Sequence, residues 1–231
     1  MQILEVKETI LENNKADADK FRQEMAEKDI FYVNIMSSPG SGKTTTLLQT
    51  ISRLKDQVRI GVMEADIDSA VDAETIAAAG VRAIQLHTGG MCHLSADMSR
   101  QGMKALGVDD LDLIFLENVG NLVCPAEFDT GAHRNVVILS IAEGHDKPLK
   151  YPLMFEVADL VLINKMDASP VFDFDLNKVK EFIALRNPGA RVIPISARTG
   201  QGMAEWCAWL LGEMQKRDET NAMSAYYGRK N

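Results

Sequence analysis

The chain has 231 residues, enough for one large α/β domain or two small ones. Its formal net charge of −8 disfavours nucleic acid as a partner, because contact with a phosphate backbone requires clustered lysine and arginine. No window holds the roughly 18 consecutive apolar residues of a transmembrane helix, and the polar N-terminus lacks the apolar core of a signal peptide. We therefore expect a cytoplasmic protein with neither a membrane nor a nucleic-acid partner.

Three regions are expected along the chain. Residues 1–29 should form N-terminal amphipathic helices that pack on the main domain, which should span 30–217 and end in a polar tail at 218–231. Continuous apolar runs predict strands at 31–36, 58–64, 81–86, 111–117, 135–141, 158–164 and 190–196. Helical patterns are expected at about 43–55, 71–79, 93–106, 173–186 and 202–216.

The strand pattern also indicates the fold class. Strands that are apolar on both faces must be covered on both sides, which is typical of parallel sheets. Strand and helix alternation then predicts an α/β fold with a doubly wound, mostly parallel sheet. In such a sheet, ligands bind outside the carboxyl ends of the strands.

A phosphate-binding loop is predicted between the first strand and the next helix, where residues 37–45 read SSPGSGKTT. The spacing G-x-x-x-x-G-K-[ST] is met except that Ser37 replaces the first glycine. Lys43 would reach the β- and γ-phosphates, and the Thr44 hydroxyl would coordinate Mg²⁺. The expected nucleotide contacts in this P-loop are Gly40, Ser41, Gly42, Lys43, Thr44 and Thr45.

A guanine-binding pocket is predicted at the ends of two later strands. Asn164-Lys165-Met166-Asp167 follows the strand LVLIN, and the Asp167 carboxylate can accept two hydrogen bonds that guanine offers and adenine does not. Lys165 would lie along the ring face. Ser196 and Ala197 match the second guanine loop, where a backbone N–H would meet the guanine oxygen. The three elements in this order predict GTP as the ligand.

Acids at strand ends are the expected partners of Mg²⁺ and of the γ-phosphate. Glu117 ends the apolar run LDLIFLE, and Asp66 follows another strand, so both join Lys43 and Thr44 as candidate catalytic and Mg²⁺-binding residues. Gly120 could offer its N–H to the γ-phosphate, while Asp68 and Asp72 are weaker candidates. Because no glutamine lies beside this loop to orient a water, slow intrinsic hydrolysis is expected.

Two cysteines and a histidine follow neighbouring strands at the same edge. Cys92 and His93 come after the third strand and Cys124 after the fourth. Two thiolates and an imidazole suit Ni²⁺ or Zn²⁺, but three ligands do not close a structural zinc site. The residues alone leave two alternatives open: a metal site, or small buried side chains. Cys207 lies on the apolar face of a helix and is expected in the core.

Beyond these patterns, the chain resembles the HypB family of hydrogenase nickel-incorporation GTPases, relatives of the urease accessory GTPase UreG. The segments that carry the resemblance are SSPGSGKTTTL, ADIDSAVDAETI, TGGMCHLSADM, DLIFLENVGNLVCPAEFD, ADLVLINKMD and SARTGQGMAEW. The resemblance implies a SIMIBI-class P-loop GTPase that helps insert nickel into [NiFe]-hydrogenase precursors. It further implies HypA, a metallochaperone, and the hydrogenase large-subunit precursor as partners.

The same resemblance implies a GTP-dependent homodimer. It places a Ni²⁺ or Zn²⁺ site at Cys92, His93 and Cys124, near the dimer interface. Lys150 matches a family lysine that reaches the guanine of the neighbouring subunit. GTP or GDP, Mg²⁺ and a transition metal are therefore the expected ligands.

Two other classes of protein share some of these motifs. A urease or cobalamin-enzyme accessory GTPase would share the nucleotide motifs, but a Cys-Pro-His motif would favour the urease protein, whereas Cys92-His93 and Cys124-Pro125 are separate here. A small-molecule kinase could use the same P-loop. Such kinases need no NKxD loop, so the sequence NKMD argues against this class.

Overall fold

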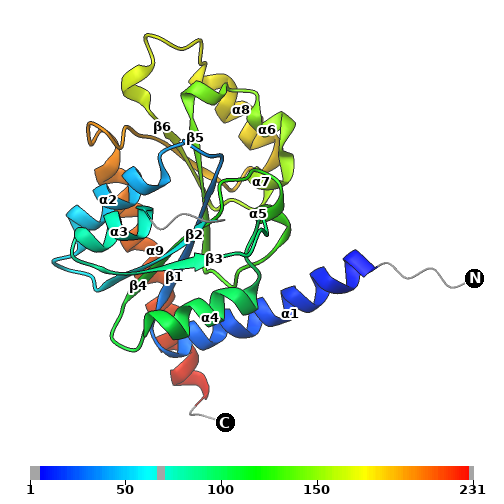
Figure 1. Ribbon diagram of the computed structural model, residues 1–231, viewed down its shortest axis with the longest axis vertical. Helices are drawn as coiled ribbons and strands as arrows, with labels where there is room; N and C mark the ends of the chain where they lie inside the picture. The colour runs from blue at the N-terminus through cyan, green and yellow to red at the C-terminus, as the bar shows by residue number, and fades with distance from the viewer. Residues whose placement is uncertain (1–5, 67–70, 229–231) are drawn as a thin grey trace, which may run out of the picture.

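The computed structural model describes residues 6–66 and 71–228. Its centre is a seven-stranded sheet of order β3-β2-β4-β1-β5-β6-β7, in which every pairing is parallel (Figure 1). The predicted strands are all present, shifted by at most two residues at either end. They are β1 (Phe31–Ser37), β2 (Ile60–Asp66), β3 (Arg82–His87), β4 (Leu113–Glu117), β5 (Arg134–Ser140), β6 (Leu160–Asn164) and β7 (Arg191–Pro194).

Helices connect the strands. The long ones are α1 (Val6–Glu27), α2 (Lys43–Leu54), α3 (Val71–Ala78), α4 (Ala96–Leu106), α8 (Leu176–Arg186) and α9 (Met203–Gly228). Short helices that the sequence did not predict are α5 (Cys124–Glu127), α6 (Lys147–Lys150) and α7 (Pro152–Glu156), with 3₁₀ turns η1 (Ile141–Glu143) and η2 (Met166–Ala168). Within the described ranges, no helix combines the length and apolar character needed to cross a membrane.

Both faces of the sheet are covered, as the apolar strands predict. On one face, β1 packs against α2 and α9 through a cluster that includes Phe31, Val33, Leu47, Ile51 and Trp206. On the opposite face lie α1 and α4, whose cluster includes Phe21, Tyr32, Met103, Ile114 and Leu116. A third cluster joins β5 and β6 to α7 and α8. The alternation of Phe31, Tyr32 and Val33 between the two faces confirms the doubly wound fold.

Helices form both ends of the described chain. Residues 6–27 form one continuous helix, α1, and residues 1–5 lie outside the described part. The polar segment that begins at Asp218 continues α9 as far as Gly228. No proline or glycine interrupts the chain between Glu213 and Gly228, so nothing local ends the helix earlier.

A half-buried histidine, His133, lies where α1, β1, β5 and α9 meet. His133 Nδ1 accepts a hydrogen bond of 3.0 Å from Tyr32 N, and its ring stacks on Phe31 at 5.4 Å between centroids. Burial, followed by the nearby charges of Arg217, Arg22 and Arg134, lowers the pKa of His133 to about 4. The folded protein therefore favours the neutral form of the His133 imidazole.

This junction predicts an acid-dependent loss of stability. The folded-state pKa of His133 lies below its ordinary value, so its contribution is complete above about pH 6.5 and is lost as the pH falls towards 4. Between these two pH values, the free energy of unfolding should fall by about 1.4 kcal/mol per pH unit. His133→Asn keeps an acceptor for Tyr32 N without a titrating ring, so its free energy of unfolding should fall less steeply. Urea unfolding at several pH values between 7 and 4.5 measures this, and parallel curves would contradict it.

Candidate functional site

A cavity of about 550 Å³ opens at the carboxyl ends of the central strands. Its walls come from loops that are far apart in sequence but follow β1, β2, β4 and β6. The lining residues are Pro39, Gly40, Gly42, Lys43, Thr44, Thr45, Glu64, Ala65, Asp66, Asp72, Glu117, Asn118, Val119, Gly120 and Lys165. The parallel sheet therefore gathers the P-loop, both predicted strand-end acids and part of the NKMD loop around one space.

The P-loop adopts the tight turn that its glycines allow. Gly42 has φ +99°, and a Cβ there would lie 2.5 Å from the Asn164 amide nitrogen, so only glycine fits. Ser37, which stands where the motif has its first glycine, is fully buried. Its hydroxyl accepts a bond of 2.6 Å from Ser41 Oγ and donates one of 2.7 Å to Ser38 O. The hydrogen bond between Ser37 and Ser41 stabilises the turn, so the loop keeps its shape although Ser37 replaces the first glycine of the motif.

The expected magnesium corner lies beside the P-loop lysine. Thr44 Oγ1 donates to Glu117 Oε1 at 3.0 Å, and Lys43 Nζ lies 3.9 Å from the same oxygen. Glu117 is buried, and that burial raises the pKa of its carboxyl despite the nearby lysine. Asp66 lines the cavity, as does the weaker candidate Asp72, whereas Asp68 falls outside the described residues.

Glu64 is a site residue that the sequence analysis missed. It lies directly across from Glu117 in the register of β2 and β4, and it is 3% exposed. Burial and the Glu117 charge raise the pKa of the Glu64 carboxyl far above its usual range. The signal was available, because Glu64 is also an acid at the end of an apolar run.

The donor set at this corner suits a hard cation. Glu64 Oε1 and Glu117 Oε2 are buried and have no hydrogen-bond partner within the described part of the chain. The Thr44 hydroxyl completes a group of three oxygen donors next to the phosphate loop. Mg²⁺ prefers such oxygen ligands. The residues present therefore fit the ion that the P-loop motif implies.

The loop after β6 is bonded to both the P-loop and the last guanine loop. Asn164 Nδ2 donates to Ser41 O at 2.9 Å, and Asn164 Oδ1 accepts from Ala197 N at 3.1 Å. Lys165 Nζ donates to Gly40 O at 2.7 Å, which extends its stem across the cavity edge. Asp167 accepts a bond of 2.6 Å from Ser196 Oγ. All the expected base-pocket residues are thus together, although Ala197 N is already bonded to Asn164.

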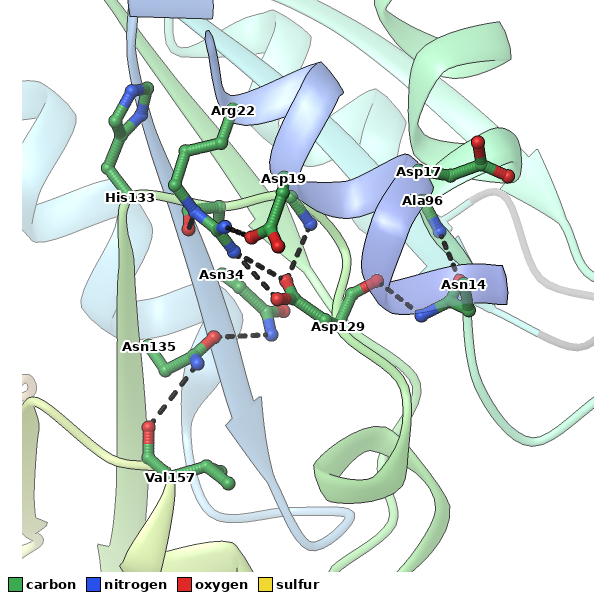
Figure 2. A network of polar contacts seen from close by, with 12 residues as sticks. Asn14, Asp17, Asp19, Arg22, Asn34, Ala96, Asp129, His133, Asn135 and Val157 are labelled. Atoms are coloured by element: carbon green, nitrogen blue, oxygen red, sulfur yellow. Dashed lines mark hydrogen bonds and ion pairs between the residues drawn. The ribbon is translucent and has the colours of Figure 1, made fainter. Parts of the chain in front are cut away.

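The loop after β4 contacts the P-loop and is anchored by a row of buried amides. A Cβ at Gly120 would lie 3.1 Å from Pro39 N, so a side chain here would crowd the P-loop backbone. Asn118 Nδ2 donates to Asn34 Oδ1, and Asn34 Nδ2 donates to Asn135 Oδ1, both at 3.0 Å. Figure 2 shows the second of these bonds and its continuation from Asn135 to Val157 O. The sequence analysis did not identify this row.

The expected metal ligands Cys92, His93 and Cys124 lie in one region of the structure. Interaction with the Cys124 thiol, together with burial, raises the pKa of the Cys92 thiol. His93 Nδ1 lies 4.0 Å from Cys92 Sγ, while its ring stacks on Phe128 at 3.7 Å between centroids. No group of three His, Cys, Asp or Glu side chains in the described ranges has metal-binding geometry. Cys207 is buried in the core, as expected.

Lys150 lies away from the cavity. It belongs to α6, is exposed, and pairs with Asp146 at 2.6 Å. Within this chain, therefore, Lys150 does not join the other expected nucleotide contacts.

Comparison with known proteins agrees with this geometry. Residues 31–194 match the family model described as CobW/HypB/UreG, nucleotide-binding domain. The hydrogenase maturation factor HypB of Escherichia coli K12 is 46% identical over 209 residues, covering 90% of this chain and 72% of that protein.

Two crystal structures are also similar. HypB from Archaeoglobus fulgidus has a TM-score of 0.81 and 40% identity, over 87% of this chain and 98% of that one. HypB from Helicobacter pylori, in complex with nickel, has a TM-score of 0.82 and 37% identity, over 88% and 96%. The expected α/β P-loop fold of the SIMIBI class is thereby confirmed. With its P-loop, NKMD loop and strand-end acids around one cavity, the chain belongs to the HypB family of hydrogenase maturation factors.

Proposed function

We propose that this chain is a cytoplasmic GTPase that assists nickel insertion into [NiFe]-hydrogenase, with nickel as its cargo. The observation that carries the proposal is the shared loop after β4. This loop follows Glu117 at the end of β4, contributes Gly120 to the nucleotide cavity and, four residues later, carries the Cys124 thiol, whose interaction with Cys92 raises the pKa of the Cys92 thiol. The membership of the HypB family supports the hydrogenase role.

Guanine specificity rests on Asp167 and the loops around it. Its carboxylate is partly exposed beside the cavity and is oriented by Ser196 Oγ. Lys165, anchored to Gly40 O, would stack along one face of the base. When guanine binds, the Ala197 N–H would donate to the guanine oxygen. It would do so either in place of Asn164 Oδ1 or in a bifurcated hydrogen bond to both acceptors.

Hydrolysis would use the groups around the phosphates. The P-loop N–H groups and Lys43 would hold the β- and γ-phosphates, and Gly120 N would meet the γ-phosphate. Thr44, Glu117 and Asp66 would hold Mg²⁺, and we add Glu64 because its unbonded oxygen faces the same corner. When bound, Mg²⁺ supplies charge that stabilises the transferring phosphate. A slow rate is expected, since no glutamine lies beside the loop to orient water.

The cargo site would use the paired thiols and His93. Two thiolates and an imidazole suit Ni²⁺ or Zn²⁺, and the HypB structure from Helicobacter pylori contains nickel. His93 would have to turn its ring from Phe128, or a second subunit would complete the ligands. We propose a GTP-dependent homodimer in which Lys150 reaches the partner's guanine, and HypA and the hydrogenase large-subunit precursor as further partners.

Asp167→Asn should weaken GTP binding and shift preference towards xanthine nucleotides. An amide can donate a hydrogen bond to the xanthine carbonyl, whereas the carboxylate accepts two bonds from guanine. Competition among GTP, XTP and ATP measures the preference. Asp173→Asn, at an exposed position after the same strand, is the matched control. If Asp167→Asn kept the wild-type order of bases, the assigned guanine pocket would be wrong.

Lys43→Ala should reduce nucleotide affinity by about 2–5 kcal/mol, because a desolvated charge-assisted contact is lost. Calorimetry with GDP and with a non-hydrolysable GTP analogue measures the loss, and circular dichroism checks the fold. Lys180→Ala, at an exposed position on α8, should bind as the wild type does. Wild-type affinity in Lys43→Ala would reject the phosphate role of this loop.

Ni²⁺ affinity should differ by about 5–150-fold between the GDP and GTP-analogue states, the usual range of allosteric coupling. The reason is that Gly120, packed on Pro39, and Cys124 lie on one loop, so a change at the γ-phosphate moves one thiol relative to the other. Cys92→Ala or Cys124→Ala should remove the difference and leave GTP binding unchanged. Equal Ni²⁺ affinities in the two states of one preparation would refute the coupling.

A further inference from the structure

The thiol site is assembled from two separate segments of chain. Cys92 and His93 lie between β3 and α4, whereas Cys124 starts α5 in the segment between β4 and β5. Strand β2 lies between β3 and β4 in the sheet, so these segments do not leave from adjacent strands. Their distance therefore depends on contacts outside the sheet.

One side chain of α1 bonds both segments. Asn14 Nδ2 donates to Asp129 O at 2.9 Å, and Asn14 Oδ1 accepts from Ala96 N at 3.0 Å (Figure 2). Ala96 is the third residue after His93, and Asp129 is the fifth after Cys124. Because both ends of one rigid amide are used, Asn14 fixes how far apart the two backbones lie.

The bond to Ala96 also satisfies the first turn of α4. The N–H groups at a helix start have no partner within the helix. Ser95 Oγ accepts from Met98 N, and Asn14 accepts from Ala96 N, so the two caps are complementary. The start of α4, three residues from His93, is thereby held by α1.

The other end of the bridge is anchored on α1 as well. Arg22 donates to both Asp129 carboxylate oxygens, at 2.8 and 2.7 Å, and to Ala132 O at 2.8 Å. A Cβ at Gly131 would lie 2.7 Å from the Phe21 ring, so the segment packs closely on the helix. Figure 2 shows Arg22 and Asn14 on the same side of α1, both bonded to Asp129.

A second contact between the segments continues the bridge towards the thiols. The His93 ring stacks on Phe128, which adjoins Asp129. The contacts in order are Asn14 with Asp129, and Phe128 with His93, whose Nδ1 lies 4.0 Å from Cys92 Sγ. A shift of one segment at the Asn14 end would be transmitted along this row to the sulfur atoms.

We propose that Asn14 is a positioning residue for the metal-cargo site, holding the Cys92–His93 and Cys124 segments at the separation that metal binding needs. The proposal rests on the proposed function, which assigns that site to a metal. Metal–ligand distances tolerate errors of only about 0.2 Å, so a loosened bridge should weaken binding even though Asn14 is not a ligand.

The test compares Asn14→Ala, Asn14→Asp and the control Asn13→Ala in the full chain. Asn13 is the same residue type, one position earlier and exposed. Asn14→Asp keeps an acceptor for Ala96 N at the positive end of α4 but loses the donor to Asp129 O. It should therefore retain more thermal stability than Asn14→Ala while positioning the thiols no better.

Three measurements are made on each variant. Ni²⁺ affinity is measured by chelator competition, and the thiolate-to-nickel charge-transfer band reports ligand geometry. In metal-free protein, dibromobimane, which fluoresces after joining two nearby thiols, reports the Cys92–Cys124 separation. Both Asn14 variants should lose about 10–100-fold in Ni²⁺ affinity, as for residues that orient ligands, with an altered band and slower bridging. GTP affinity should stay as in the wild type.

The outcomes separate this proposal from the proposed function. Asn14 variants that match Asn13→Ala in affinity, band and bridging would overturn the positioning role. An Asn14→Asp protein with wild-type affinity would also overturn it, because the bond to Ala96 alone would then suffice. If wild type and Cys92→Ala bound Ni²⁺ equally, the metal function would fail, while slower bridging in both Asn14 variants would still show that Asn14 holds the segments together.

Discussion

The nucleotide cavity depends on the side chain of Asn164. Its amide joins the P-loop at Ser41 O, its own loop at Lys165 N and the last guanine loop at Ala197 N. The residue is 2% exposed, so each lost bond would leave a buried polar group unpaired at a cost of about 1–3 kcal/mol. Gly42 has no side chain because this amide occupies the space. The spacing between the phosphate and base subsites is therefore set before any nucleotide binds.

The sequence predicted what depends on local pattern. Apolar runs located every strand, and the spacing around Lys43 and Asp167 identified the loops that enclose the cavity. The ends of the strands were predicted less accurately, because the hydrogen-bonded pairing between strands continues beyond the apolar residues. β2 runs on to Asp66, which places Glu64 inside the strand opposite Glu117. Short helices such as α5 hold too few residues to show a period.

What the sequence could not show are contacts between distant positions. Asn14 bonds residues 82 and 115 positions away, and no local pattern marks an asparagine on a helix surface for this use. The His93 ring lies 4.0 Å from the Cys92 sulfur, but no local pattern indicated that it also stacks on Phe128. Such choices depend on which side chains the tertiary fold brings near, and one sequence does not contain that information.

The row of amides from Asn118 through Asn34 to Asn135 has a direction. Each donates to the next, and the last donates to Val157 O, so all three dipoles point away from the nucleotide cavity. The backbone groups at the two ends of the row fix this direction. Asn118 Oδ1 accepts from Val119 N, and Val157 O can only accept, so a reversed row would set two acceptors against each other at Val157 and leave Val119 N without its acceptor. Asn34 is 1% exposed, so a break in the middle of the row would leave a buried amide unpaired. The loop after β4, which leads to Gly120 and Cys124, is therefore held in a single polarity.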